Sequence, residues 1–144
     1  PVRSSRGLVG QIFRTTANSA QVVLITDASV SVPVRLSQSR SPGVVRGGAA
    51  GGLLTLEYVS LEAQLSPNEV ILTAGVQGTS PQEIIANRYP RDLVVGRVID
   101  IERSDAALFQ QGVIQPDVDF ETLETVFVIT GFEESNIFYR EYYV

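Results

Sequence analysis

The chain alternates short runs of Val, Ile, Leu and Tyr with clusters of Gly, Pro, Ser, Asn and Asp, whereas helical periodicity is scarce. Apolar runs of this length between turn-forming residues are typical of strands, so the pattern predicts an all-β domain, arranged as barrels or a sandwich. The expected strands are Leu8 to Phe13, Gln21 to Thr26, Val32 to Leu36, Val44 to Arg46, Leu53 to Val59, Val70 to Thr73, Val94 to Ile101, Phe109 to Gln115 and Thr125 to Thr130.

The most glycine-rich separator is Gly47 to Gly52. Because an expected strand lies on each side of it, we interpret it as a hairpin loop, in which glycine adopts positive φ angles without steric cost. The alternative is a phosphate-binding loop, but that motif needs a strand before it and a helix after it. A strand follows here, so the hairpin is favoured.

Two stretches depart from the strand pattern. Ser80 to Glu83 has the form of a capping box with Pro at the first helical position, which predicts one short helix at residues 81–88. The other stretch is an aromatic tail at residues 133–144, which follows a domain expected over residues 1–132. The periodicity of the tail does not distinguish strand, helix and disorder.

The tail owes its name to four aromatic side chains, Phe138, Tyr139, Tyr142 and Tyr143. Such side chains anchor partners in many interfaces, or they pack against their own domain. We favour packing against the domain, because exposed aromatic surface lowers solubility.

The amino-acid inventory excludes most catalytic chemistry. The chain has no His and no Cys, and all its basic residues are Arg. It cannot build a Ser-His-Asp triad, a Cys-His pair, a Schiff-base amine, a P-loop lysine or an imidazole zinc site. We therefore expect no catalytic residue, no cofactor-binding residue and no enzymatic activity. A net charge of -5 also argues against nucleic acid as a partner.

Asp117, Asp119 and Glu121 alternate, and an extended backbone would place their carboxylates on one face. Calcium prefers such oxygen ligands, but the twelve-residue loop and the glycine of the common calcium motif are absent. We therefore favour a solvated acidic turn after Pro116 and expect no metal site.

No apolar run approaches the length of about 18 residues that a membrane-spanning helix needs. The chain contains no Met, so we expect it to be a fragment or a processed piece, with any membrane anchor located upstream. The lack of Cys does not settle the compartment.

Several blocks carry a family resemblance through their order and spacing. They are Gly7 to Ile12, Val22 to Asp27, Val32 to Arg35, Gly43 to Gly47, Leu53 to Val59, Val70 to Gly75, Pro90 to Val98 and Pro116 to Val126. Together they resemble the extracytoplasmic β domain of the MreC family of bacterial rod shape-determining proteins. The chain departs from the family pattern by inserting Thr79 to Tyr89 before Pro90. It also begins at a position inside the family's domain.

The resemblance implies two small β-barrels, of which the first is expected to be incomplete because of that starting point. It also implies a location on the periplasmic face of the bacterial inner membrane, with a coiled coil and one transmembrane helix upstream. The implied function is a non-catalytic scaffold of the cell-elongation complex that positions peptidoglycan synthases and needs no cofactor. The implied partners are the elongation-specific penicillin-binding protein, MreD and MreB, together with self-association.

Two other function classes remain open. One is a generic all-β module that binds carbohydrate or another ligand. The other is a degenerate chymotrypsin-like protease, which also has two packed barrels, but the absence of His argues against it.

Overall fold

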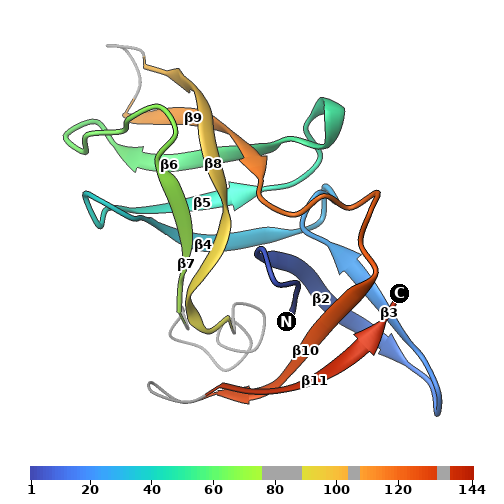
Figure 1. Cartoon of the computed structure of the whole chain (residues 1–144). Coiled ribbons are helices and arrows are strands. Elements are labelled where there is room, and N and C mark those ends of the chain that lie inside the picture. The colour runs from blue at the N-terminus through green and yellow to red at the C-terminus, as the bar shows by residue number, and fades with distance from the viewer. Residues whose placement is uncertain (76–88, 104–107, 133–136) are drawn as a thin grey trace.

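The computed structural model describes residues 1–75, 89–103, 108–132 and 137–144, and these residues form strands with a single 3-10 turn (Figure 1). The strands are β1 (Val2–Arg3), β2 (Leu8–Thr15), β3 (Ala20–Leu24), β4 (Ser31–Leu36), β5 (Pro42–Arg46), β6 (Leu54–Ser60), β7 (Val70–Ala74), β8 (Arg91–Glu102), β9 (Phe109–Pro116), β10 (Thr125–Phe132) and β11 (Ile137–Tyr143). The predicted all-β fold is therefore confirmed.

Six antiparallel strands close into a barrel in the order β4-β5-β6-β9-β8-β7. Side chains alternate between the two sides of a strand, and in β4 this places Val32, Val34 and Leu36 in the barrel interior, all fully buried. β9 comes late in the chain but pairs between β6 and β8, and this placement closes the barrel.

The other five strands form a curled, open sheet in the order β11-β10-β1-β2-β3 (Figure 1). β1, only two residues long, lies between β2 and β10, with Val2 opposite Val128. One closed barrel beside one open, half-barrel sheet confirms the expectation of two barrels with the first incomplete.

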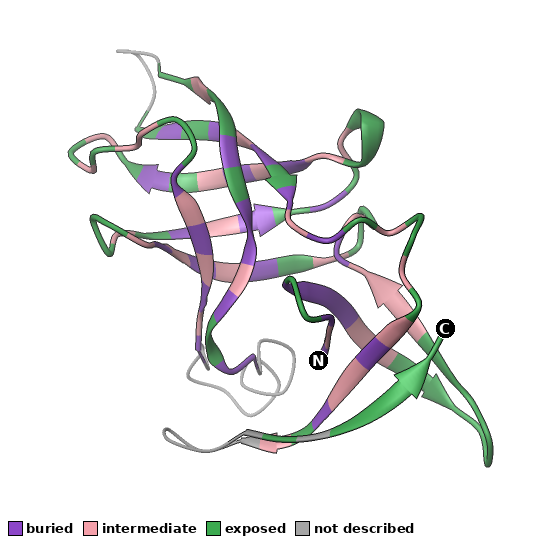
Figure 2. Ribbon diagram, in the orientation of Figure 1, coloured by how far each residue is buried: buried purple, intermediate pink, exposed green. Residues whose placement is uncertain are grey.

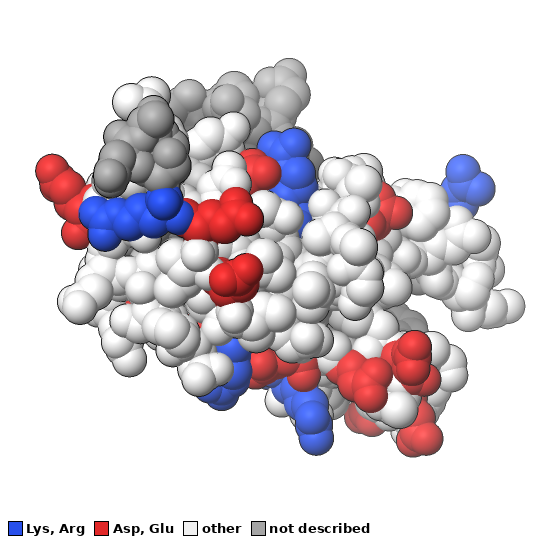
Figure 3. Space-filling view, turned by 90° about the horizontal axis from the view of Figure 1, so that it is seen from above, with Lys and Arg blue, Asp and Glu red and all other residues white. Residues whose placement is uncertain are grey.

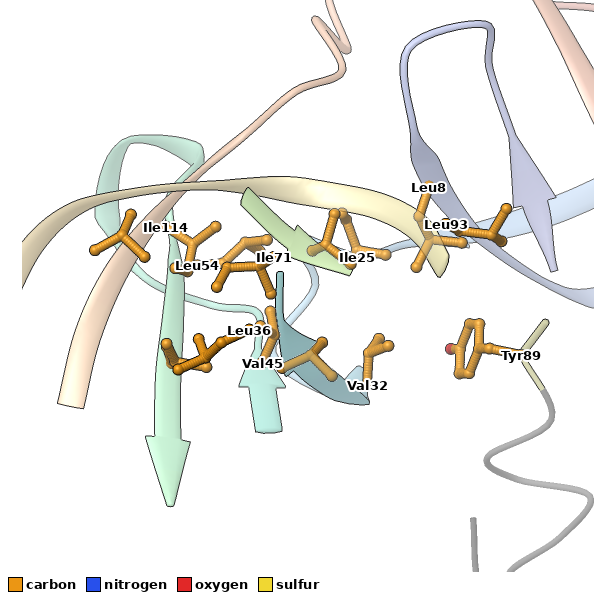
Figure 4. Close-up of a cluster of buried hydrophobic side chains, with 14 of the residues drawn as sticks. Leu8, Ile25, Val32, Leu36, Val45, Leu54, Ile71, Tyr89, Leu93 and Ile114 are labelled. Carbon is orange, nitrogen blue, oxygen red and sulfur yellow. The ribbon is translucent and has the colours of Figure 1, made fainter. Parts of the chain in front are cut away.

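The barrel and the open sheet share a hydrophobic core. Leu8 and Ile25 of the sheet side belong to the same buried cluster as Val32 and Leu93 of the barrel (Figure 4). Ile129 of β10 is part of this cluster too. A second, smaller cluster lies within the sheet and consists of Val2, Val9, Val118 and Val126. Figure 2 shows buried residues on strands of both units, alternating with more exposed ones in the barrel. The two units are therefore packed together as one body.

Two glycines allow strands to approach closely. A Cβ at Gly10 would overlap the carbonyl oxygen of Val23 on β3, and a Cβ at Gly96 would overlap that of Gln115 on β9. Both lie beside irregularities in strand register, which is where small residues are expected.

The threonine hydroxyl of Thr73 holds β7 to the start of β8. Thr73 is fully buried, its Oγ1 donates to the Pro90 carbonyl at 2.5 Å, and the Leu93 amide donates to the same Oγ1 at 2.9 Å. The register between β7 and β8 shifts at this point. The side chain thus supplies hydrogen bonds where the regular ladder is interrupted.

All nine predicted strands are confirmed, with β1 and β11 in addition. Gly47 to Gly52 connects the paired strands β5 and β6, as the hairpin interpretation predicts, and includes the 3-10 turn Ala50–Gly52. The short helix predicted at residues 81–88 lies outside the described residues. The division into a domain at 1–132 and a tail at 133–144 stays a prediction, although β11 pairs with β10.

Candidate interaction surface

Most of the large apolar side chains exposed on the described surface fall into two groups, whereas Phe13 and Ile99 are exposed outside them. The first group, which we call the aromatic corner, consists of Tyr58, Leu108 and Phe109 at one end of the barrel. The second group follows β11 and consists of Phe138, Tyr142, Tyr143 and the adjoining Val144. Exposed apolar groups of this kind on a folded domain are candidates for contact with other molecules.

A β-bulge turns Tyr58 outward. Glu57 and Tyr58 of β6 together oppose a single residue of β9, because Leu56 pairs with Gly112 and Val59 pairs with Gln110. Tyr58 takes a φ angle of 62°, a left-handed conformation that is unusual for a bulky residue. Its ring meets the Phe109 ring edge to face, with the centroids 5.6 Å apart, a favourable arrangement for aromatic pairs.

The segment after Tyr58 is fixed by side chains from neighbouring strands. The buried Gln110 amide donates to the carbonyls of Ser60 at 2.8 Å and Ala63 at 2.6 Å. The Arg103 guanidinium donates to the Leu61 carbonyl at 3.1 Å. These bonds hold the end of β6 in place, so the aromatic corner is formed before any partner binds, which reduces the entropic cost of binding.

β11 is an edge strand of the open sheet. The tail, for which the periodicity left three conformations open, is extended over Ile137–Tyr143, with Arg140 opposite Val128 and Tyr142 opposite Val126. Its backbone therefore packs on its own domain, whereas the side chains of Phe138 and Tyr142 are about half exposed.

The three alternating carboxylates do not converge. Asp117 lies 3.6 Å from Arg97, and the Asp119 carboxylate accepts a hydrogen bond from the Glu121 amide at 3.1 Å. The chain turns after β9 instead of continuing as a strand, and the described residues contain no acidic cluster suited to a metal ion. The geometry agrees with the acidic-turn interpretation.

A polar hollow of about 350 Å³ lies between the β1–β2 turn and the connection from β9 to β10. Arg6, Asp119 and Glu124 line it together with Ser and Thr residues. Sequence reasoning missed this hollow, because its two sides are more than 100 residues apart in the chain.

The charged side chains are scattered over the surface. On the face presented in Figure 3, basic side chains form no continuous surface.

Sequence reasoning also missed Gln110 and Glu69, which are buried polar residues. A signal for Glu69 was present, because the alternation of a strand places residue 69 on the same side as Ile71 and Thr73. Ile71 and Thr73 are both fully buried, so residue 69 was expected on the buried side.

Among the described residues, no helix has the length and hydropathy needed to cross a membrane. The family model described as rod shape-determining protein MreC, barrel core, matches residues 1–130. The chain belongs to the MreC family. The resemblance that the sequence blocks carry is thereby confirmed.

Two MreC relatives illustrate how much of a full-length protein is present here. The cell shape-determining protein MreC of Escherichia coli K12 is 26% identical over 104 residues, which are 72% of this chain and 27% of that protein. The Listeria monocytogenes MreC is 24% identical over 132 residues, which are 89% of this chain and 42% of that protein. The chain thus spans less than half the length of these relatives.

Solved MreC structures share the fold. One MreC structure has a TM-score of 0.74 at 22% identity, covering 88% of this chain and 66% of the other. A chain in the complex between penicillin-binding protein PBP2 and MreC from Helicobacter pylori has a TM-score of 0.62 at 17% identity, covering 81% of this chain and 66% of the other.

Proposed function

We propose that this chain is the extracytoplasmic β domain of a cell-shape scaffold that positions peptidoglycan synthases in the bacterial cell-elongation complex. The observation that carries the proposal is the match to the MreC family over residues 1–130, since the MreC relatives are named as cell shape-determining proteins. The scaffold is non-catalytic and needs no cofactor. It acts on the periplasmic side of the inner membrane, with its anchor upstream of this chain.

The proposed direct partner is the elongation-specific penicillin-binding protein, and MreD and MreB complete the assembly. A structural neighbour of this chain occurs in a complex between PBP2 and MreC, which supports this choice of partner. Self-association through the open sheet is part of the same proposal, because β11 and β3 are edge strands and edge strands pair readily with other chains.

The aromatic corner is the proposed contact for the penicillin-binding protein. Tyr58 and Phe109 pack against each other and are 54% and 43% exposed. Buried Gln110 and the Arg103 guanidinium fix the segment that follows Tyr58. Rigid aromatic side chains of this kind supply much of the binding free energy at protein interfaces.

Isothermal titration calorimetry with the periplasmic part of the elongation-specific penicillin-binding protein tests the proposal. Tyr58→Ser with Phe109→Ser should weaken binding by about 30-fold or more, since loss of an interface hot spot costs about 2 kcal/mol. Phe13→Ser is the matched control, because Phe13 is equally exposed but lies on the β2–β3 hairpin.

The outcomes separate the two parts of the proposal. If the unmodified chain binds and the double variant binds equally well, the aromatic corner is not the contact. If the chain binds neither this protein nor a second copy of itself, the scaffold proposal is wrong. Specific hits on a glycan array would favour the carbohydrate-binding module instead.

A further inference from the structure

The connection between β6 and β7 packs onto one end of the barrel and finishes in a tight turn at Ser66 to Glu69. Ala63 and Leu65 of this connection pack against the barrel core. Within the turn, the Glu69 amide donates to the Ser66 carbonyl at 3.2 Å, and Asn68 takes a left-handed φ angle of 63°.

Two backbone hydrogen bonds attach this turn to β8. The Asn68 amide donates to the Val98 carbonyl at 2.8 Å, and the Val98 amide donates to the Glu69 carbonyl at 3.0 Å. The position of the Glu69 side chain is therefore tied to the contact between the turn and the barrel wall.

Glu69 is buried without a partner among the residues that the structure describes. Only 3% of the residue is exposed, and neither carboxylate oxygen has a hydrogen-bond partner there. Strand alternation places it on the inward side shared by Ile71 and Thr73. An ionised carboxylate in such a position is costly, because it loses its hydration and gains no compensating charge or donor.

Other charged side chains near the turn do not supply that compensation. The charged residues on adjoining elements are Arg35 on β4, Arg40 in the β4–β5 turn, Glu57 on β6, Glu62 in the connection itself, Arg91, Asp92, Arg97, Asp100 and Glu102 on β8, and Arg103 after it. β9 carries no charged residue. Within the described residues, none of these groups pairs with Glu69: Arg35 pairs with Asp92, Arg97 with Asp117, and Arg103 binds a carbonyl.

We propose that Glu69 is a proton-controlled latch: its neutral carboxyl keeps the Ser66–Glu69 turn docked on β8, and ionisation releases the turn from the barrel end. Burial raises the pKa of the Glu69 carboxyl above its ordinary value of 4.5. The docked turn binds the Glu69 proton more tightly than the released turn does, so protonation stabilises the docked state. This stabilisation is fully present below pH 4.5 and is lost as the pH rises through the raised pKa.

The latch adjoins the aromatic corner. The same connection begins at Ser60, two residues after Tyr58, and is anchored by Gln110, which directly follows Phe109. Release of the turn would therefore loosen the segment that supports this corner, which makes the surface sensitive to pH.

Amide hydrogen exchange measured by NMR tests the latch on the isolated chain without any partner, so its failure leaves the proposed function untouched. The readout is the protection of the Asn68 and Val98 amides between about pH 4 and about pH 8, corrected for the intrinsic exchange rate. The Ile25 amide, bonded to the Val9 carbonyl at 3.0 Å, is the internal control. The variants are Glu69→Gln and, as a matched control, Glu62→Gln.

In the unmodified chain and in Glu62→Gln, protection of the Asn68 and Val98 amides should fall by up to tenfold per pH unit between the two pKa values of Glu69. In Glu69→Gln this fall should disappear. The latch is refuted if protection of Val98 follows that of Ile25 at every pH in the unmodified chain, or if Glu69→Gln retains the same pH dependence.

Discussion

Replacing Thr73 with Val tests whether a single buried hydroxyl joins β7 to β8. The substitution keeps the shape of the side chain but removes both hydrogen bonds of Oγ1, leaving the Pro90 carbonyl and the Leu93 amide unpaired. Both of those residues are buried, so water does not replace the lost partner.

The expected loss can be worked out from these two groups. A buried donor or acceptor without a partner costs about 1–3 kcal/mol, and burying a methyl group in place of the hydroxyl offsets about 1 kcal/mol. For two such groups the free energy of unfolding should therefore fall by about 1–5 kcal/mol. At about 4 °C per kcal/mol for a chain of this size, the Tm should fall by about 4–20 °C.

Urea unfolding followed by circular dichroism measures this change. Thr55→Val on β6 is the matched control, since Thr55 is half-buried and its side chain makes no hydrogen bond to the described part of the chain. Thr73→Ser should stay close to the unmodified chain because it keeps the hydroxyl. Equal stability of Thr73→Val and Thr55→Val, within about 0.5 kcal/mol, would refute the reasoning.

Two further predictions concern the glycine loop and a buried tyrosine. Gly51 and Gly52 both have a φ angle of 72° with open space around them, so changing both to Val should lower the Tm through backbone strain of about 1–2 kcal/mol each, whereas Asn should cost less. Equal melting of the Val and Asn variants would contradict this. Burial raises the pKa of Tyr89 to about 12, so stability should fall above pH 10, and ultraviolet titration should show a late-ionising phenol that Tyr89→Phe removes. Ionisation of every tyrosine near pH 10 would contradict the prediction of a raised pKa for Tyr89.

Strand positions were predictable because their signals are local. Val32, Val34 and Leu36 alternate with less buried residues, and turn-forming residues mark both ends of the segment. β1 and β11 were not predicted, since a strand of two residues has no periodicity and the run of aromatic residues in β11 does not alternate. Pairing with β10 defines both of these strands.

The candidate surface depended on information that no local pattern contains. Tyr58 and Phe109 meet only because β9 inserts beside β6. Tyr89 was assigned to an inserted stretch, but the structure places it in the main core, where only 2% of it is exposed. A run of residues that lengthens a connection can still end in a side chain that the core requires.

The position of β9 and β10 has a consequence for the order in which the protein can fold during synthesis. β4 to β7 can pair as soon as residue 74 is made, but the interior of this half-formed barrel stays open until β8 and β9 follow. β1 can pair with β2 early, but its other partner, β10, is completed only at residue 132, so the open sheet stays unfinished longer still. A nascent chain therefore carries exposed apolar strands through most of its synthesis, and non-local pairing of this kind makes folding slow and favours aggregation beforehand.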